Sequence, residues 1–61
     1  MEVTRLLTLD ETAERLRRSP NAVRWMCSKK VGPKSAKIAG RVMFREADVE
    51  AYINEQFERA S

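Results

Sequence analysis

The stretch that decides the fold is residues 8–29, TLDETAERLRRSPNAVRWMCSK, because it contains two helix starts close together. Thr8 followed three residues later by Glu11 forms a capping box, in which each side chain satisfies a backbone N–H of the first turn. Ser19-Pro20 is the second start, because Ser is a common N-cap residue and the fixed φ of Pro suits the first helical position. Two successive helices are therefore predicted here.

The predicted helices are short and lie close together along the chain. The first runs from its cap at residue 8 to about residue 17, and apolar residues recur along it at helical spacing. The second spans about residues 20–29. Only two or three residues remain between the two helices, which indicates a tight helix-turn-helix and not a loose pair.

Beyond Lys30 the apolar residues recur in a period of two. Gly32-Pro33 ends the second helix. Four apolar residues then alternate with longer or basic ones and predict a two-stranded hairpin: Ala36, Ile38, Val42 and Phe44. For the loop Ala39-Gly40 we expect a type I turn followed by Gly40 in the left-handed region. A type I′ turn would also place Ala39 at positive φ.

A third helix is predicted over about residues 45–57, with Glu46 and Asp48 near its positive N-terminus. The element order gives the fold class, which is mainly α with a small β-hairpin. We predict one winged helix-turn-helix domain over residues 1–61, with three helices and a two-stranded wing. The predicted core is Leu6, Leu9, Ala13, Leu16, Val23, Met26, Cys27, Ile38, Val42, Phe44, Val49, Tyr52 and Ile53.

Length and composition exclude several classes of protein. A 61-residue chain has little room for an enzyme cleft, and no nucleophile with a base partner or phosphate-binding loop is visible. One Cys and no His leave no disulfide and no structural zinc site, and no cofactor is expected. No apolar run reaches the roughly 20 residues of a membrane helix or forms a signal peptide. The chain is expected to be cytoplasmic.

Charge is sharply segregated along the sequence. Residues 17–45 contain nine basic residues and no acid, whereas the segments on either side are net acidic. A single-sign stretch inside a foldable segment is typical of a nucleic-acid-binding protein. An anionic membrane surface is the weaker alternative.

The second helix offers a candidate DNA-reading face. Ala22, Val23, Met26 and Cys27 should face the core, and the opposite face carries Asn21, Arg24, Trp25 and Ser28. Asn can pair with adenine and Arg with guanine, while Trp25 could cover a sugar or a thymine methyl. The alternative is that Arg24 anchors a phosphate and Trp25 packs at the rim of the core.

Other candidate contacts lie outside this face. Arg41 at the wing tip can enter a narrow minor groove, with a solvated turn residue as the alternative. Cys27 is interpreted as a small core residue. Phe57 either closes the bundle or contacts another protomer or a partner protein. Candidate phosphate contacts without base specificity are Arg18, Lys29, Lys30, Lys34 and Lys37.

Residues 6–53 resemble the MerR-like winged-helix family. The resemblance is carried by residues 6–16 (LLTLDETAERL), Ser19, Val23-Arg24-Trp25, Ser28-Lys29, Gly32-Pro33-Lys34-Ser35, Lys37-Ile38, Gly40-Arg41-Val42 and residues 44–53 (FREADVEAYI). Within the family the chain is similar to small excisionases, the recombination directionality factors of temperate phages. Arg17 and Ala39 depart from the pattern, because the family prefers Gly at both places. Each of these residues lowers the folding stability by about 1 kcal/mol if its φ is positive.

The resemblance implies a function at the bacterial nucleoid. The second helix would enter the major groove and the wing the minor groove of double-stranded DNA. Neighbouring protomers would bind cooperatively, bend the DNA and bias a tyrosine or serine integrase towards excision. The protein would be a monomer in free solution. A transcription regulator with the same domain is the runner-up, and a module that binds an acidic protein is a third possibility.

Overall fold

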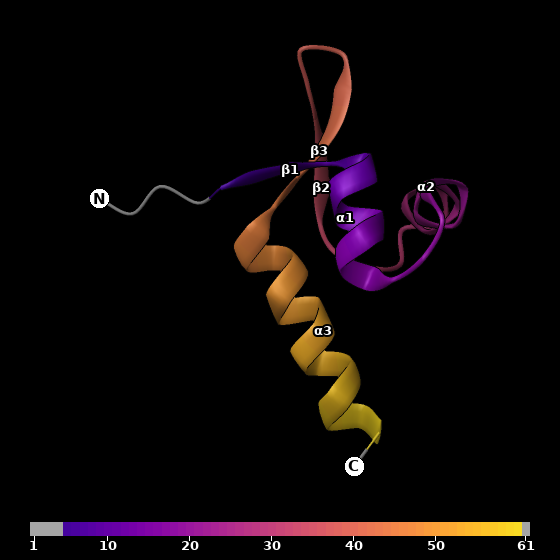
Figure 1. The fold of residues 1–61 in the computed structure, drawn as a ribbon, viewed down its shortest axis with the longest axis vertical. Helices are drawn as coiled ribbons and strands as arrows, with labels where there is room; N and C mark the ends of the chain where they lie inside the picture. The colour runs from indigo at the N-terminus through magenta and orange to yellow at the C-terminus, as the bar shows by residue number, and fades with distance from the viewer. Residues whose placement is uncertain (1–4, 61) are drawn as a thin grey trace.

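The computed structural model describes residues 5–60, which form three helices and one three-stranded antiparallel sheet (Figure 1). The predicted winged helix-turn-helix architecture is confirmed. In chain order the elements are β1 (Leu6–Thr8), α1 (Leu9–Leu16), α2 (Pro20–Ser28), β2 (Ser35–Ile38), β3 (Arg41–Arg45) and α3 (Glu46–Ala60). Each helix lies within three residues of its predicted bounds.

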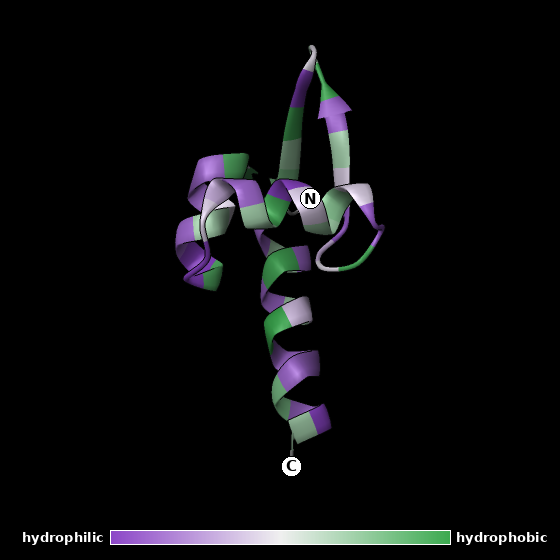
Figure 2. Cartoon of the chain, turned by 90° about the vertical axis from the view of Figure 1, so that its right-hand side faces the viewer, coloured by the Kyte–Doolittle hydropathy of each residue, from purple (hydrophilic) through white to green (hydrophobic). Residues whose placement is uncertain are grey.

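Strand β1 was not predicted. It pairs antiparallel with β3, which is the central strand in the order β1-β3-β2. The pairing runs from Leu6 opposite Arg45 to Thr8 opposite Met43, so the outer half of the hairpin remains two-stranded. Figure 2 shows this hairpin projecting from the body. Three residues are too few to display a period of two, and their partners lie far away in sequence.

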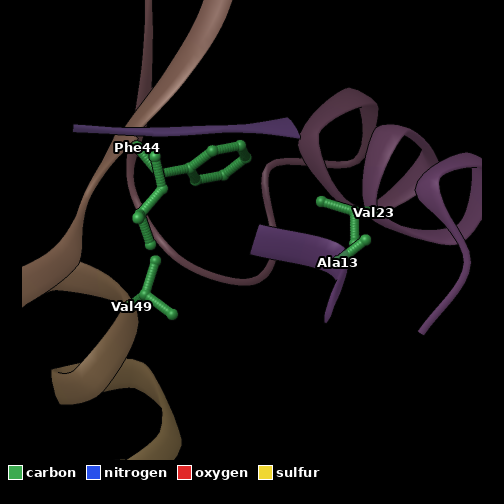
Figure 3. Close-up of a cluster of buried hydrophobic side chains, with 5 residues drawn as sticks. Ala13, Val23, Phe44 and Val49 are labelled. Carbon is green, nitrogen blue, oxygen red and sulfur yellow. The ribbon is translucent and has the colours of Figure 1, made fainter. Parts of the chain in front are cut away.

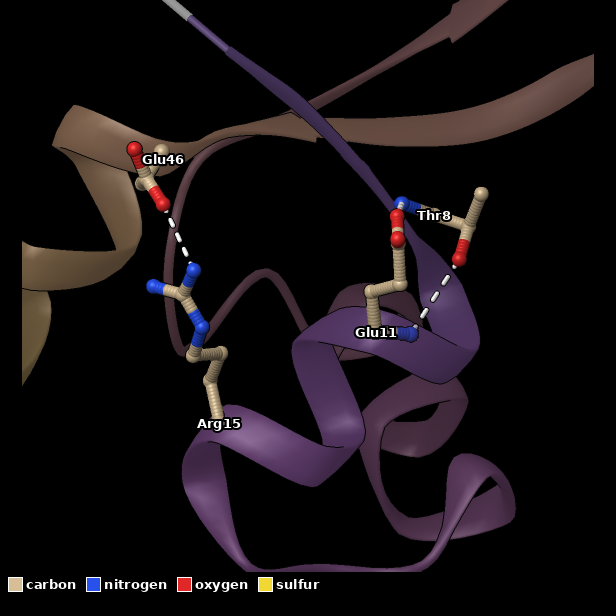
Figure 4. A network of polar contacts seen from close by, with 4 residues as sticks. All are labelled: Thr8, Glu11, Arg15 and Glu46. Carbon is tan, nitrogen blue, oxygen red and sulfur yellow. Dashed lines mark hydrogen bonds and ion pairs between the residues drawn. The ribbon is translucent and has the colours of Figure 1, made fainter.

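The helix caps agree with the sequence. The Thr8 N–H donates to Glu11 Oε1 at 2.9 Å, and the Glu11 N–H donates to Thr8 Oγ1 at 3.1 Å, which completes the capping box (Figure 4). Ser19 Oγ accepts from the Ala22 N–H at 3.2 Å at the start of α2. Both helices of the helix-turn-helix therefore begin at a satisfied N-cap.

The wing turn differs from the prediction. Ala39 has φ 53° and Gly40 has φ 81°, so both central residues are left-handed, as in a type I′ turn. Ile38 pairs with Arg41, which leaves two residues for the loop. A two-residue loop of this type matches the twist of the strands, and this preference overrides the cost of positive φ at Ala39. Arg17, the C-cap of α1, is also left-handed at φ 57°.

The buried core lies where the sheet meets the three helices (Figure 3). Its apolar members are Leu7, Ala13, Val23, Phe44 and Val49. Leu6 and Ile38 were wrongly predicted as core, since they are 44% and 45% exposed. Because β1 is a strand, its alternation turns Leu7 inward and Leu6 outward. Ile38 lies at the far end of the hairpin, beyond the helices.

An ion pair joins the first helix to the last. Arg15 Nη2 of α1 lies 2.6 Å from Glu46 Oε2 at the start of α3 (Figure 4). The Glu46 N–H also donates to the Arg5 carbonyl at 2.8 Å. These contacts and buried Val49 hold the first turns of α3 against the body, and the rest of the helix extends away from it (Figure 1).

Candidate nucleic-acid interface

Helix α2 separates its side chains as the sequence predicted. Val23 is buried, and Ala22, Met26 and Cys27 are half-buried. The opposite face is exposed along its length and carries Asn21, Arg24, Trp25 and Ser28. Trp25 is 58% exposed, so most of its indole ring is open to a partner. The structure thus brings the four proposed reading residues to one accessible surface, and their roles on DNA stay predictions.

A hollow of about 370 Å³ lies between α2, the wing and the first turn of α1. It is lined by Thr8, Leu9, Asp10, Arg24, Cys27, Gly40, Arg41, Val42 and Met43. Arg24 and Arg41, which the sequence assigned to different grooves of DNA, therefore border the same concave surface. We refer to it below as the interface hollow.

The tip of the wing is exposed. Arg41 is exposed and lies opposite Ile38 at the turn, and a Cβ built on Gly40 would meet nothing within 4 Å. Strand β1 ends opposite Met43, so it covers neither Arg41 nor Gly40. The tip therefore has room to enter a groove.

The arginines divide into paired and unpaired groups. Arg15 is held by Glu46, and Arg45 Nε donates to Asp48 Oδ2 at 2.7 Å. Within residues 5–60, Arg24 and Arg41 have no such carboxylate partner. An unpaired guanidinium beside a concave surface remains free to bind a phosphate or a base edge.

The proposed phosphate contacts lie on exposed surface outside the lining of the interface hollow. All five side chains are exposed: Arg18, Lys29, Lys30, Lys34 and Lys37. Lys30 and Lys34 line a further shallow depression after α2, and Arg18 lies in the turn between α1 and α2. All five are accessible to a partner, and their contact with phosphate stays a prediction.

Phe57 lies away from this interface. It is 75% exposed near the end of α3 and so does not close the bundle. With Arg17 and Arg18 it borders an apolar hollow of about 520 Å³, whose floor includes Leu16, Met26, Tyr52 and Ile53. A contact with another protomer or an integrase stays a prediction.

The sequence reading missed Asp10 as a member of the interface. In the sequence Asp10 belongs to the acidic segment that precedes the nine basic residues. The fold places it in the interface hollow with Arg24 and Arg41. Only the pairing of β1 with β3, which brings the start of α1 beside the wing, could have revealed this position.

Comparison with known proteins identifies the family. The helix-turn-helix domain family matches residues 6–56, from β1 through most of α3. It is a DNA-binding family that includes excisionase-like proteins. No curated protein and no solved structure gives a significant match. Within residues 5–60, no helix has the length and hydropathy that crossing a membrane would need. The chain therefore belongs to the helix-turn-helix domain family and is a DNA-binding protein.

Proposed function

We propose that this chain is a sequence-guided, cooperative DNA-binding and DNA-bending factor that directs integrase-mediated site-specific recombination towards excision. The observation that supports it best is the interface hollow, where unpaired Arg24 of α2 and unpaired Arg41 of the wing lie on one concave surface. A body with a helix and a wing on one side can engage two adjacent grooves of a duplex. The excision step rests on the resemblance to small excisionases.

Each element has a distinct task in the proposed complex. Helix α2 lies in the major groove, where Arg24 pairs with guanine and Asn21 with adenine. Trp25 covers a sugar or a thymine methyl. Arg41 enters the minor groove, and the exposed basic residues around the hollow hold phosphates. Engagement of both grooves by a small body favours a bend towards the protein, since bending brings more phosphates to its basic surface.

Cooperation between protomers follows from the distribution of charge. Residues 17–45 carry nine basic residues, whereas residues 46–61 carry five acids and one Arg. Helix α3 extends from the body (Figure 1), so the acids beyond its first turn can lie against the basic flank of a neighbour on a direct repeat. Exposed ion pairs contribute under about 1 kcal/mol each, so the free protein stays monomeric and the copies cooperate only on DNA.

A transcription regulator with the same domain is the second candidate. It is favoured by exposed Phe57 beside the apolar hollow of about 520 Å³, which a second copy could cover in a stable dimer. Such a dimer would bind palindromic half-sites, whereas an excision factor would bind direct repeats. In the first proposal the same residue instead contacts a neighbouring protomer or the integrase.

A footprint on the DNA that flanks the protein's own gene tests the proposal. Direct repeats that fill cooperatively, together with a monomer in sedimentation of the free protein, are the expected result. A palindromic site and a dimer in free solution would favour the transcription regulator. If repeats fill independently in gel shifts on DNA with one and several sites, the cooperative array is wrong.

A further inference from the structure

We infer that Asp10 is an affinity-limiting charge inside the DNA interface, which keeps the binding of a single copy weak on any sequence. The inference rests on the proposed DNA-binding mode. Asp10 is exposed and is the acidic residue among those that line the interface hollow, where Arg24 and Arg41 also lie. Within residues 5–60 its carboxylate forms no ion pair with either arginine.

The fold fixes this carboxylate beside the wing. Strand β1 ends at Thr8, which lies opposite Met43, and α1 begins at the next residue. The first turn of α1 is therefore anchored at the base of the hairpin. The next acid, Glu11, is engaged by Thr8 in the capping box. Asp10 has no ion pair within residues 5–60, and it lies in the lining of the hollow.

The path of the DNA brings phosphates to the same place. Adjacent major and minor grooves are separated by one sugar–phosphate backbone. If α2 lies in the major groove and the wing in the minor groove, that backbone passes between them, over the interface hollow. Its phosphates then meet Arg24 and Arg41 as attractive charges and Asp10 as a repulsive one. This repulsion does not depend on base sequence.

A loss of affinity that is equal on all DNA sequences has a specific consequence for a protein that binds cooperatively. It lowers the affinity for cognate and random DNA by the same factor, so one copy dissociates readily from either. Stable occupancy then requires neighbouring copies, each of which raises the effective concentration of the next. Asp10 would thus make binding depend on the number of adjacent sites.

The test uses Asp10→Asn, with Glu50→Gln as the matched control. Both variants remove one negative charge, but Glu50 is an exposed residue of α3 outside the interface hollow. Affinity is measured by titration of a short random-sequence duplex with room for one copy, and of a single cognate site from the footprint. We expect Asp10→Asn to bind both about three- to tenfold more tightly than the wild type. The dependence of log K on log salt should steepen by up to about 0.9.

Three outcomes would overturn the inference. The affinity of Asp10→Asn could match that of Glu50→Gln, it could fall on both duplexes, or it could fall only on the cognate site. The last result would mean that Asp10 accepts a hydrogen bond from a base. Loss of the favourable first-turn charge slightly weakens α1, so damage to the fold cannot imitate tighter binding. If the wild type binds no duplex at all, the proposed function fails instead.

Discussion

Thr12 is the buried polar residue among residues 5–60. Its side chain is fully buried, and Oγ1 has no hydrogen-bond partner within residues 5–60. A buried unpaired hydroxyl loses its bonds to water without replacement. Thr12→Val keeps the shape of the side chain and replaces the hydroxyl with a methyl group. We expect the free energy of unfolding to rise by about 1 kcal/mol in chemical denaturation.

Thr8→Val is the control for this substitution. It makes the same chemical change at a hydroxyl that accepts from the Glu11 N–H. Loss of this N-cap should lower the free energy of unfolding by about 0.5–2 kcal/mol. A loss of stability in both variants would show that the Thr12 hydroxyl has a partner in solution.

Substitutions in and beside α2 should distinguish contacts with bases from contacts with phosphates. Arg24→Ala and Asn21→Ala should each lose about 1–3 kcal/mol of binding free energy on the cognate site and much less on random DNA. Lys34→Ala should weaken both complexes equally, because Lys34 is proposed to contact only phosphate. Gel-shift titrations on the two duplexes measure the difference. Equal losses in all three variants would mean that α2 does not read the sequence.

At the scale of elements, the capping box makes α1 sensitive to acid. The hydrogen bond from the Thr8 N–H lowers the pKa of Glu11 below its ordinary value of 4.5. Because the pKa is lower in the folded state, the carboxylate stabilises the fold above pH 4.5, and this contribution is lost as the pH falls through the folded pKa. Wild type should therefore be more stable than Glu11→Gln at neutral pH.

The difference between these two proteins is the quantity to measure. Gln can still accept the bond from Thr8, so the fold should remain intact in the variant. Denaturation at a series of pH values should show the advantage of wild type shrinking below pH 4.5. An advantage that stays constant into strong acid would mean that the Glu11 charge contributes nothing to the cap.

The wing should act as a separate element of recognition. Arg41 is exposed beside an open turn, where a long cation can follow a narrow minor groove. Arg41→Ala should therefore lose most affinity on sites with an A·T-rich minor groove. Titrations on duplexes that differ only in A·T content beside the α2 site measure this. Equal losses on all of them would argue against insertion of the wing.

Local signals in the sequence were enough to place the helices. The Thr8 and Ser19 caps act over three residues, and both are found as expected. Strand β1 could not be predicted, since it exists only through its pairing with β3. The same strand explains why Leu7 is buried and Leu6 is not. At Ala39, the geometry of a two-residue hairpin loop requires a positive φ, although this conformation is energetically unfavourable for Ala.

The parts of the candidate site that depend on local sequence were also predictable, and the parts that depend on distant contacts were not. The two faces of α2 follow from helical periodicity alone, and burial separates them as expected. That Arg24, Arg41 and Asp10 border one hollow depends on how the hairpin, α1 and α2 meet. No local pattern contains that information.

At the scale of the whole molecule, nine basic residues within one segment should make DNA binding strongly dependent on salt. Arg45 is held by Asp48, whereas Arg24, Arg41 and the exposed residues around them remain available. With about four to six phosphate contacts per protomer, the slope of log K against log salt should be roughly −4 to −5. A slope near zero in a salt titration would instead favour a module that binds an acidic protein.

Strand β1 also determines when this chain can fold during its synthesis. Leu6 pairs with Arg45, and Leu7 of the same strand belongs to the core with Phe44 and Val49. The first strand must therefore wait until residue 45 has left the ribosome, although both helices of the helix-turn-helix emerge earlier. Until then Leu7 has no core to enter, and the nascent chain is open to proteases and chaperones. We expect a truncated product that ends before β3 to leave Leu7 without its core partner Phe44 and to remain sensitive to proteases.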